Sequence, residues 1–242
     1  MANVEGRNPV NELLNGNRKV EEILLQKDIH GEIIDKIKEK AKKNNISIRE
    51  VSKKHLDNIA DSYAHQGVIA KAEEINLVSP EDIVEYAQSQ DEPPFIIILD
   101  QVQDPHNFGS IIRSAHSAGA HGLIFQKRRA ASITPAVLKA SAGASEHLLL
   151  SQVTNINYTI EKLKELGVWI TGTDLDTEKY YDDIDYRGST AVVIGNEGSG
   201  LRRLVKDNCD FLVKIPIKGR VDSLNASVAA GVIFYEVVRQ RK

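Results

Sequence analysis

The chain has 242 residues, a formal net charge of −3 and an apolar fraction of 41%. This length suits one large domain or two smaller ones, and the near balance of charge excludes a disordered or strongly basic protein. Any contact with nucleic acid must therefore come from local basic patches.

The single cysteine, Cys209, excludes an internal disulfide framework and a cysteine-based zinc site, and it fits a reducing cytosol. We expect no metal site. The sequence opens without a signal peptide and has no apolar run of about 20 residues, which a membrane span needs. We therefore expect a cytoplasmic protein without a membrane segment.

Residues 1–72 alternate short strands with amphipathic helices. The pattern predicts strands at 19–26, 46–51 and 67–72, and helices at 29–43 and 52–60, the second capped by Ser52. Lysines cover this module: Lys36, Lys38, Lys40, Lys42, Lys43, Lys53 and Lys54. They could be a solvated surface or contact RNA, and charge alone does not decide between these alternatives.

An acidic, polar stretch over residues 73–94 predicts a linker, with a short helix at 80–90. From Phe95 onward, wholly apolar strands alternate with helices. The predicted strands are 95–99, 122–125, 147–150, 168–171, 191–194 and 211–215, and the predicted helices are 107–118, 135–142, 156–166, 198–208 and 223–241. This alternation predicts an α/β domain over 95–242, with a parallel sheet covered on both faces and ligands at the carboxyl ends of its strands.

A glycine-rich turn, Gly195-Asn-Glu-Gly-Ser-Gly200, follows the strand at 191–194, and a second loop, 219–223, precedes the last helix. Glycines let a backbone approach a ligand closely, so the two loops predict a cleft for a flat, polar-edged group such as adenine. The turn is neither a dinucleotide fingerprint nor a phosphate loop. It could equally be structural, with Glu197 favouring the start of the following helix.

Two further stretches allow a functional and a structural interpretation. After the first strand of this domain, Asn107 is placed to cap a helix and Arg113 lies on its polar face. They could be only a cap and an exposed arginine, or they could hold a phosphate and a sugar hydroxyl. The basic loop Lys127-Arg-Arg129 could contact an RNA backbone or be solvated, and the pattern does not decide.

Three stretches together resemble the motifs of the SpoU/TrmH-type RNA ribose 2'-O-methyltransferases of the SPOUT superfamily. They are Asp104-Pro-His-Asn107 followed after five residues by Arg113-Ser-Ala, Gly195-Asn-Glu-Gly-Ser-Gly-Leu201, and Ser223-Leu-Asn-Ala-Ser-Val-Ala229. Their order and spacing match over residues 95–242. The opening Val4-Glu-Gly-Arg-Asn-Pro-Val10 and the run 139–147 resemble most the members that methylate a guanosine of bacterial 23S ribosomal RNA.

The resemblance implies a Rossmann-like domain with a C-terminal trefoil knot that binds S-adenosylmethionine and forms a homodimer. It also implies that residues 1–72 are an L30e-like RNA-binding domain. The family's catalytic positions correspond to Asn107, Arg113, Glu197, Ser223 and Asn225. The cofactor positions correspond to Gly195, Ile215 and Leu224, with Thr171, Gly172 and Thr173 as neighbours. Asp222 is a conservative variant of the family's glutamate.

The implied reaction moves a methyl group from a sulfonium to a ribose oxygen, which is a weak acid and needs a base or electrostatic help. The family proposal gives this role to Arg113, although a guanidinium pKa above about 12 conflicts with it. Arg113 could instead clamp a phosphate or stabilise the alkoxide. Asn107 and Asn225 would orient the ribose or Arg113, and Glu197 could position Arg113.

Three rival functions stand beside methylation of ribosomal RNA. The first is the same chemistry on tRNA, and the second is a catalytically silent RNA-binding protein with this fold. The third, a Rossmann-type dehydrogenase, is disfavoured because the Gly-x-Gly-x-x-Gly fingerprint and its acidic partner are missing.

Overall fold

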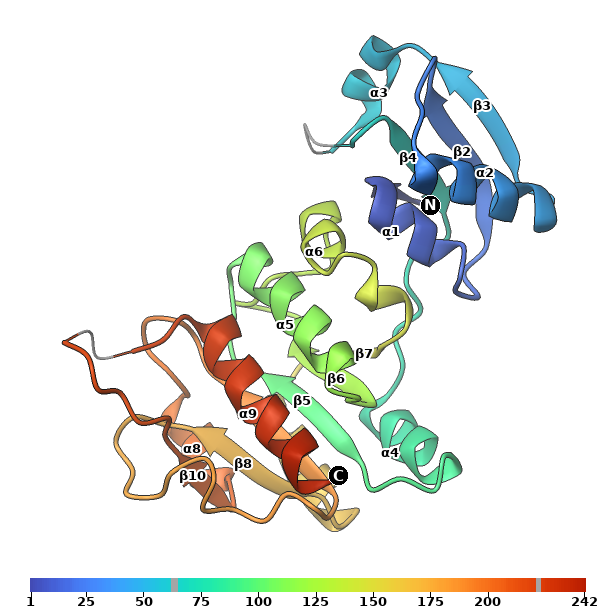
Figure 1. Ribbon diagram of the computed structural model, residues 1–242. Helices are drawn as coiled ribbons and strands as arrows, with labels where there is room; N and C mark the ends of the chain where they lie inside the picture. Colours follow the sequence, from blue (N-terminus) through green and yellow to red (C-terminus); the bar gives the residue numbers. More distant parts are fainter. Residues whose placement is uncertain (62–64, 221–222) are drawn as a thin grey trace. The chain divides into compact units, whose positions relative to one another are not determined.

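Strands and helices alternate along the whole chain and assemble into two separate sheets (Figure 1). The computed structural model describes residues 1–61, 65–220 and 223–242, so Asp222 lies outside the described residues. One compact unit comprises residues 1–76 and 133–147, and the other comprises residues 77–132 and 148–242. Among the described residues, no helix combines the length and apolar character that a membrane crossing requires.

The smaller unit contains a four-stranded sheet in the order β1-β4-β2-β3, in which only β2 and β3 run parallel. Its first elements are β1 (Ala2–Glu5), α1 (Arg7–Leu13), β2 (Val20–Gln26), α2 (Glu32–Lys43), β3 (Ser47–Val51), α3 (Lys53–Ile59) and β4 (Val68–Ala72). Apolar residues of α1 and α2 pack on one face of this sheet, and Leu56 of α3 packs on the other. Each predicted strand and helix from residue 19 to 72 is present, including the Ser52 cap, although the helix expected at 29–43 begins only at Glu32.

Two elements of the smaller unit escaped sequence-based prediction. Strand β1 has four residues, which is too short for a clear hydrophobic period. It pairs with β4, which lies far from it in the sequence. Helix α1 carries no capping side chain, and Pro9 stands within it. The signals that usually mark a helix start are therefore missing.

The chain returns to the smaller unit over residues 133–147, which form α6 (Pro135–Ala140) and the 3₁₀ helix η1 (Ala144–Glu146). Gly143 meets α1 so closely that an added Cβ would lie 2.5 Å from Glu12 Cβ. Arg18 forms an ion pair of 3.1 Å with Glu146, and both side chains are almost fully buried. These contacts explain why the segment groups with residues 1–76, whereas the sequence placed it in the 95–242 domain.

The larger unit is built on a six-stranded parallel sheet in the order β10-β8-β9-β5-β6-β7. Its strands are β5 (Phe95–Leu99), β6 (Gly122–Gln126), β7 (Leu149–Val153), β8 (Trp169–Thr173), β9 (Thr190–Ile194) and β10 (Phe211–Val213). Its helices are α4 (Pro80–Ser89), α5 (Pro105–Ser117), α7 (Ile156–Glu165), α8 (Arg203–Asn208) and α9 (Ala226–Gln240). The predicted parallel α/β class is confirmed, while the trefoil knot remains a prediction.

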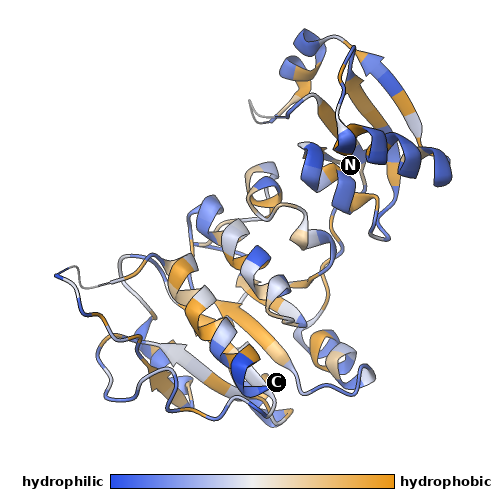
Figure 2. Cartoon of the chain, viewed as in Figure 1, coloured by the Kyte–Doolittle hydropathy of each residue, from blue (hydrophilic) through white to orange (hydrophobic). Residues whose placement is uncertain are grey.

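Helices cover both faces of this sheet, so its strands must be apolar along their whole length. Residues of α4, α7 and α8 pack with Ile96 and Ile98 of β5. On the opposite face α5 and α9 lie against each other (Figure 1), and Phe234 of α9 meets Phe95 edge to face. Accordingly, β5 is coloured hydrophobic from end to end in Figure 2.

Several expectations for this unit differ from the structure. The strand expected at 211–215 ends at Val213, and the helix expected at 223–241 begins at Ala226. The short helix expected at 80–90 is present as α4, but its Ile83 and Val84 are buried in the core of the larger unit, which a linker would not be. The strand expected at 147–150 begins at Leu149, because the 3₁₀ helix η1 extends to Glu146. The helix expected at 198–208 begins only at Arg203, since the preceding residues close a tight turn.

The stability of the larger unit is expected to depend on pH through His121. Its ring is buried, Nδ1 accepts a hydrogen bond of 3.0 Å from the Phe95 amide, and Nε2 lies 3.2 Å from a Glu92 carboxylate oxygen. Burial lowers the pKa of His121 despite that carboxylate. The unfolded chain therefore binds a proton below about pH 6.5 that the folded chain excludes.

We expect the free energy of unfolding to be highest above about pH 6.5 and to fall as the pH drops from there towards the folded-state pKa of His121. The variant His121→Asn should be less stable at neutral pH, and its stability should fall less steeply on acidification. Urea unfolding at several pH values measures both. An equally steep fall in the variant would contradict the assignment to His121.

Candidate functional site

The glycine-rich turn after β9 is closed by its own backbone. Asn196 and Gly200 exchange two hydrogen bonds, of 3.1 and 2.9 Å, and the Asn196 side chain accepts further bonds from the amides of Gly198 and Ser199. A Cβ on Gly195 would lie 2.4 Å from the carbonyl carbon of Gly200. Only glycine therefore permits this closure, and the turn presents Glu197 at its tip.

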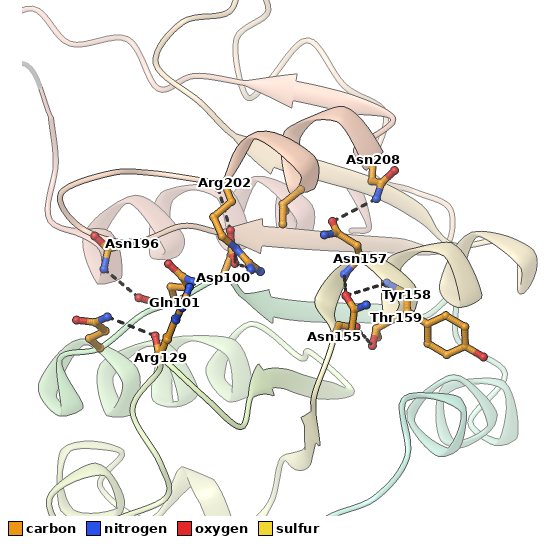
Figure 3. Close-up of polar contacts among 12 residues, drawn as sticks. Asp100, Gln101, Arg129, Asn155, Asn157, Tyr158, Thr159, Asn196, Arg202 and Asn208 are labelled. Carbon is orange, nitrogen blue, oxygen red and sulfur yellow. Dashed lines mark hydrogen bonds and ion pairs between the residues drawn. The ribbon is translucent and has the colours of Figure 1, made fainter.

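The turn is anchored to the end of β5, as Figure 3 shows. Asp100 is fully buried and accepts hydrogen bonds from Arg202, of 2.8 Å from Nε and 3.0 Å from the backbone amide. The Asn196 side chain donates to the Gln101 carbonyl at 2.9 Å. Sequence-based prediction missed Asp100, although a carboxylate directly after a wholly apolar strand was a visible signal.

A row of three polar side chains joins three separate loops. The Asn225 amide donates to Asn107 Oδ1 at 2.9 Å, and the Asn107 amide donates to Glu197 Oε1 at 2.9 Å. Asn225 also caps α9, because its Oδ1 accepts from the backbone amide of Ser227 at 2.9 Å. The structure thus brings together three of the five expected catalytic residues.

Asn107 does not cap its helix, contrary to expectation. Helix α5 begins at Pro105, and its cap is Asp104, which accepts a hydrogen bond from the His106 amide. This leaves the nearly buried Asn107 amide free to bridge Asn225 and Glu197.

Arg113 makes no hydrogen bond with the three residues of this row. Its side chain is exposed on α5 and makes no hydrogen bond or ion pair with any described residue. The Glu197 carboxylate bonds to Asn107, and a role for Glu197 in positioning Arg113 stays a prediction.

A pocket of about 330 Å³ opens beside the row, at the carboxyl ends of β8, β9 and β10. Of the expected residues, Gly195, Glu197, Ile215, Ser223, Leu224 and Thr173 line it. Thr171 and Gly172 do not: Thr171 is buried within β8, and a Cβ on Gly172 would collide with Cys209.

The pocket has an apolar body and a polar rim. Its walls include Ile194, Val213, Ile217, Ala229 and Ile233. Asp174 and Lys206, which the sequence did not suggest, line it as an ion pair of 2.7 Å. An apolar slot with a few placed polar groups and free backbone suits a nucleoside-sized ligand. Among the described residues, no cluster of histidine, cysteine and acidic side chains could hold a metal ion.

Fold and site together define an α/β protein with a nucleoside-sized pocket at the carboxyl edge of a parallel sheet. Residues 94–235 match the model of the SpoU rRNA methylase family, and residues 3–78 match that of the RNA 2'-O ribose methyltransferase substrate-binding domain. The chain therefore belongs to the SpoU methylase family.

Individual relatives agree with this membership. The chain is 43% identical to the putative TrmH family tRNA/rRNA methyltransferase YacO of Bacillus subtilis (strain 168), covering 98% of this chain and 95% of the relative. The SpoU methyltransferase AviRb from Streptomyces viridochromogenes, solved with AdoMet, superimposes with a TM-score of 0.83 at 27% identity, covering 99% and 90%. An AdoMet-bound rRNA methyltransferase from Sinorhizobium meliloti gives 0.81 at 26%, covering 98% and 87%.

Replacing Gly195 by alanine tests the turn. The added Cβ would meet backbone atoms of Gly200 and Leu201, which cannot rotate away as a side chain could. We expect Gly195→Ala to weaken cofactor binding at least tenfold and to destabilise the larger unit by about 2 kcal/mol or more, as overpacking does. Gly188→Ala is the control, because nothing lies within 4 Å of its Cβ position. Calorimetric titration and thermal unfolding measure both effects, and unchanged affinity would contradict this role of the turn.

Proposed function

We propose that this protein methylates the ribose 2'-hydroxyl of a guanosine in 23S ribosomal RNA, using S-adenosylmethionine. The observation that carries the proposal is the row Asn225–Asn107–Glu197 at the rim of a nucleoside-sized pocket. These residues are hydrogen-bonding groups fixed by their neighbours, as orientation of a ribose requires. A dehydrogenase would need a different glycine pattern, which the chain lacks.

The pocket fits the cofactor that this family uses. The turn 195–200 leaves backbone groups at the pocket, and the apolar side chains of Ile215 and Leu224 supply surfaces on which a base could lie. The carboxylate of Asp174 and the ammonium of Lys206 are polar partners at the same pocket. When bound, S-adenosylmethionine supplies a methyl group that is already activated, so the protein's task is orientation and charge stabilisation.

The row Asn225–Asn107–Glu197 would orient the ribose whose 2'-hydroxyl receives the methyl group. Because Glu197 accepts from Asn107 and Asn107 accepts from Asn225, the orientation of each amide is determined by its partner. A guanidinium stays protonated at neutral pH, so we assign Arg113 to a phosphate or to the developing oxyanion. The Arg113 side chain is exposed and bonds to no described residue of this chain. Its anionic partner would therefore arrive with the substrate or with a second subunit.

The choice of RNA rests on the smaller unit. Its match to a substrate-binding domain favours a large RNA that contacts this unit as well as the pocket. Unpaired nucleotides suit such a site, since the 2'-hydroxyl must be presented to a cleft. A tRNA is the second candidate, because the curated relatives are named as tRNA/rRNA methyltransferases.

Transfer of radiolabelled methyl groups tests the function. We expect the protein to label unmodified ribosomal RNA and to leave tRNA unlabelled, and digestion should release 2'-O-methylguanosine. Labelled tRNA would move the assignment to the second candidate. Absence of label in both RNAs and in ribosomal particles, despite bound cofactor, would favour a catalytically silent RNA-binding protein.

Substitution of Arg113 tests its role. We expect Arg113→Ala to lower turnover at least 100-fold, the usual scale for a group that stabilises transition-state charge. Cofactor affinity should stay unchanged, because Arg113 does not line the pocket. Arg203→Ala removes a charge that is 93% exposed on the same unit and serves as the control. Wild-type turnover in Arg113→Ala would remove this residue from the site.

We propose that two copies of the chain associate through α9. Val228 and Tyr235 of this helix are more than half exposed and Val232 is partly exposed, although Ile233 and Phe234 are buried in the chain's own core. Apolar side chains in such a stripe are stabilised by a second copy. Light scattering at micromolar concentration should give twice the chain mass, and Val228→Glu should reduce it. A monomeric mass for the wild type would contradict the proposal.

A further inference from the structure

The positive side chains of the larger unit fall into two groups. Most have partners: Lys162, Lys164, Arg187, Arg202, Arg203, Lys206 and Arg239 form ion pairs, Arg241 donates to carbonyls, and Lys179 and Lys214 lie over aromatic rings. Within the described residues, the others make no such contact: Arg113, Lys127, Arg128, Arg129, Lys218, Arg220 and Lys242. Three of these unpartnered cations are consecutive, at residues 127–129.

The loop that carries these three cations begins directly at the carboxyl end of β6. Leu99 of β5 pairs with Phe125 of β6, so the two strands end side by side. Neighbouring strands lie about 4.8 Å apart, which places the start of this loop one strand spacing from the residues that lead to Asn107. Three exposed positive charges therefore stand at the same edge of the sheet as the polar row and its pocket.

The loop is held in place although its side chains are free. The Ala131 amide donates to the Val102 carbonyl at 2.9 Å, and the Gln103 side chain donates to the Arg129 carbonyl at 3.4 Å. The dashed line at Arg129 in Figure 3 marks the second of these bonds. Gln101, two residues before Gln103, accepts from the Asn196 side chain of the glycine-rich turn. The Lys127 amide extends the pairing of β6 with β7.

Acidic side chains near the loop are already engaged. Asp100 is buried against Arg202, and Asp104 caps α5. The loop itself contains no aspartate or glutamate between Gln126 and Ser132. Among the described residues no carboxylate forms an ion pair with these three cations, so a phosphate could bind them without displacing one.

We propose that Lys127, Arg128 and Arg129 bind the phosphodiester backbone of the RNA strand next to the nucleotide whose ribose enters the site. This inference rests on the proposed function and adds the surface that holds the flanking phosphates. Adjacent arginines suit phosphates because their guanidinium groups donate two parallel hydrogen bonds. The contact carries no base specificity and fixes the position of the strand along the edge of the sheet.

The binding test compares two triple variants with equal loss of charge. The first is Lys127→Ala/Arg128→Ala/Arg129→Ala. The matched control is Lys162→Ala/Arg187→Ala/Arg203→Ala, which removes ion-paired cations of the same unit, each at least 38% exposed. Filter binding of a ribosomal RNA fragment at several salt concentrations gives the affinity and its salt dependence, and calorimetry gives the cofactor affinity.

We expect the first variant to bind RNA at least tenfold more weakly at about 0.1 M salt, with unchanged cofactor affinity and thermal unfolding. Its plot of log affinity against log salt should be shallower by about 1.4 to 2.1, because each single-strand phosphate contact contributes about 0.7. The control should keep the wild-type slope. In methyl transfer, the RNA KM should rise with little change in kcat.

Equal slopes and affinities in both variants and the wild type would overturn the inference and leave residues 127–129 as a solvated loop. A loss of kcat at unchanged RNA affinity would also overturn it. Failure of the proposed function would be seen separately, as a wild-type protein that binds RNA but transfers no methyl group. The salt slopes would then still decide whether this loop binds the backbone.

Discussion

The geometry of the site depends on the buried carboxylate of Asp100. It lies at the end of the central strand β5 and is paired with Arg202, at the far side of the glycine-rich turn. A buried carboxylate is costly unless its hydrogen bonds are satisfied, and Arg202 satisfies this one through both its side chain and its backbone. Because the pair fixes one end of the turn to β5, Glu197 can reach Asn107 on the helix that follows the same strand.

The three residues of the polar row come from three different elements, which together fix their orientation. Asn225 starts α9, Asn107 lies in the first turn of α5, and Glu197 stands at the tip of the turn. The packing of α5 and α9 on one sheet face fixes the first two relative to each other. Since a carboxylate can only accept, it determines the direction of each amide along the row.

The sequence predicted much of this arrangement because its signals are local. Wholly apolar runs identified the parallel strands, and three motifs identified Asn107, Glu197 and Asn225 before the structure placed them together. The sequence could not predict that Asp104, and not Asn107, caps α5, because aspartate and asparagine are both good caps. Only the tertiary contacts of Asn107 with Glu197 and Asn225 decide between them. The Asp174–Lys206 pair escaped notice for the same reason, since 31 positions separate partners that meet only in the folded chain.

The close approach of Gly143 to Glu12 makes the smaller unit depend on a segment from later in the chain. A fragment that ends at residue 76 contains all four strands of the smaller sheet but lacks the 133–147 segment, which carries the partner of the buried Arg18. An isolated guanidinium in that position would have to reach solvent or another anion. The buried contacts of the smaller unit are therefore complete only with residues that the ribosome synthesises after β5 and β6.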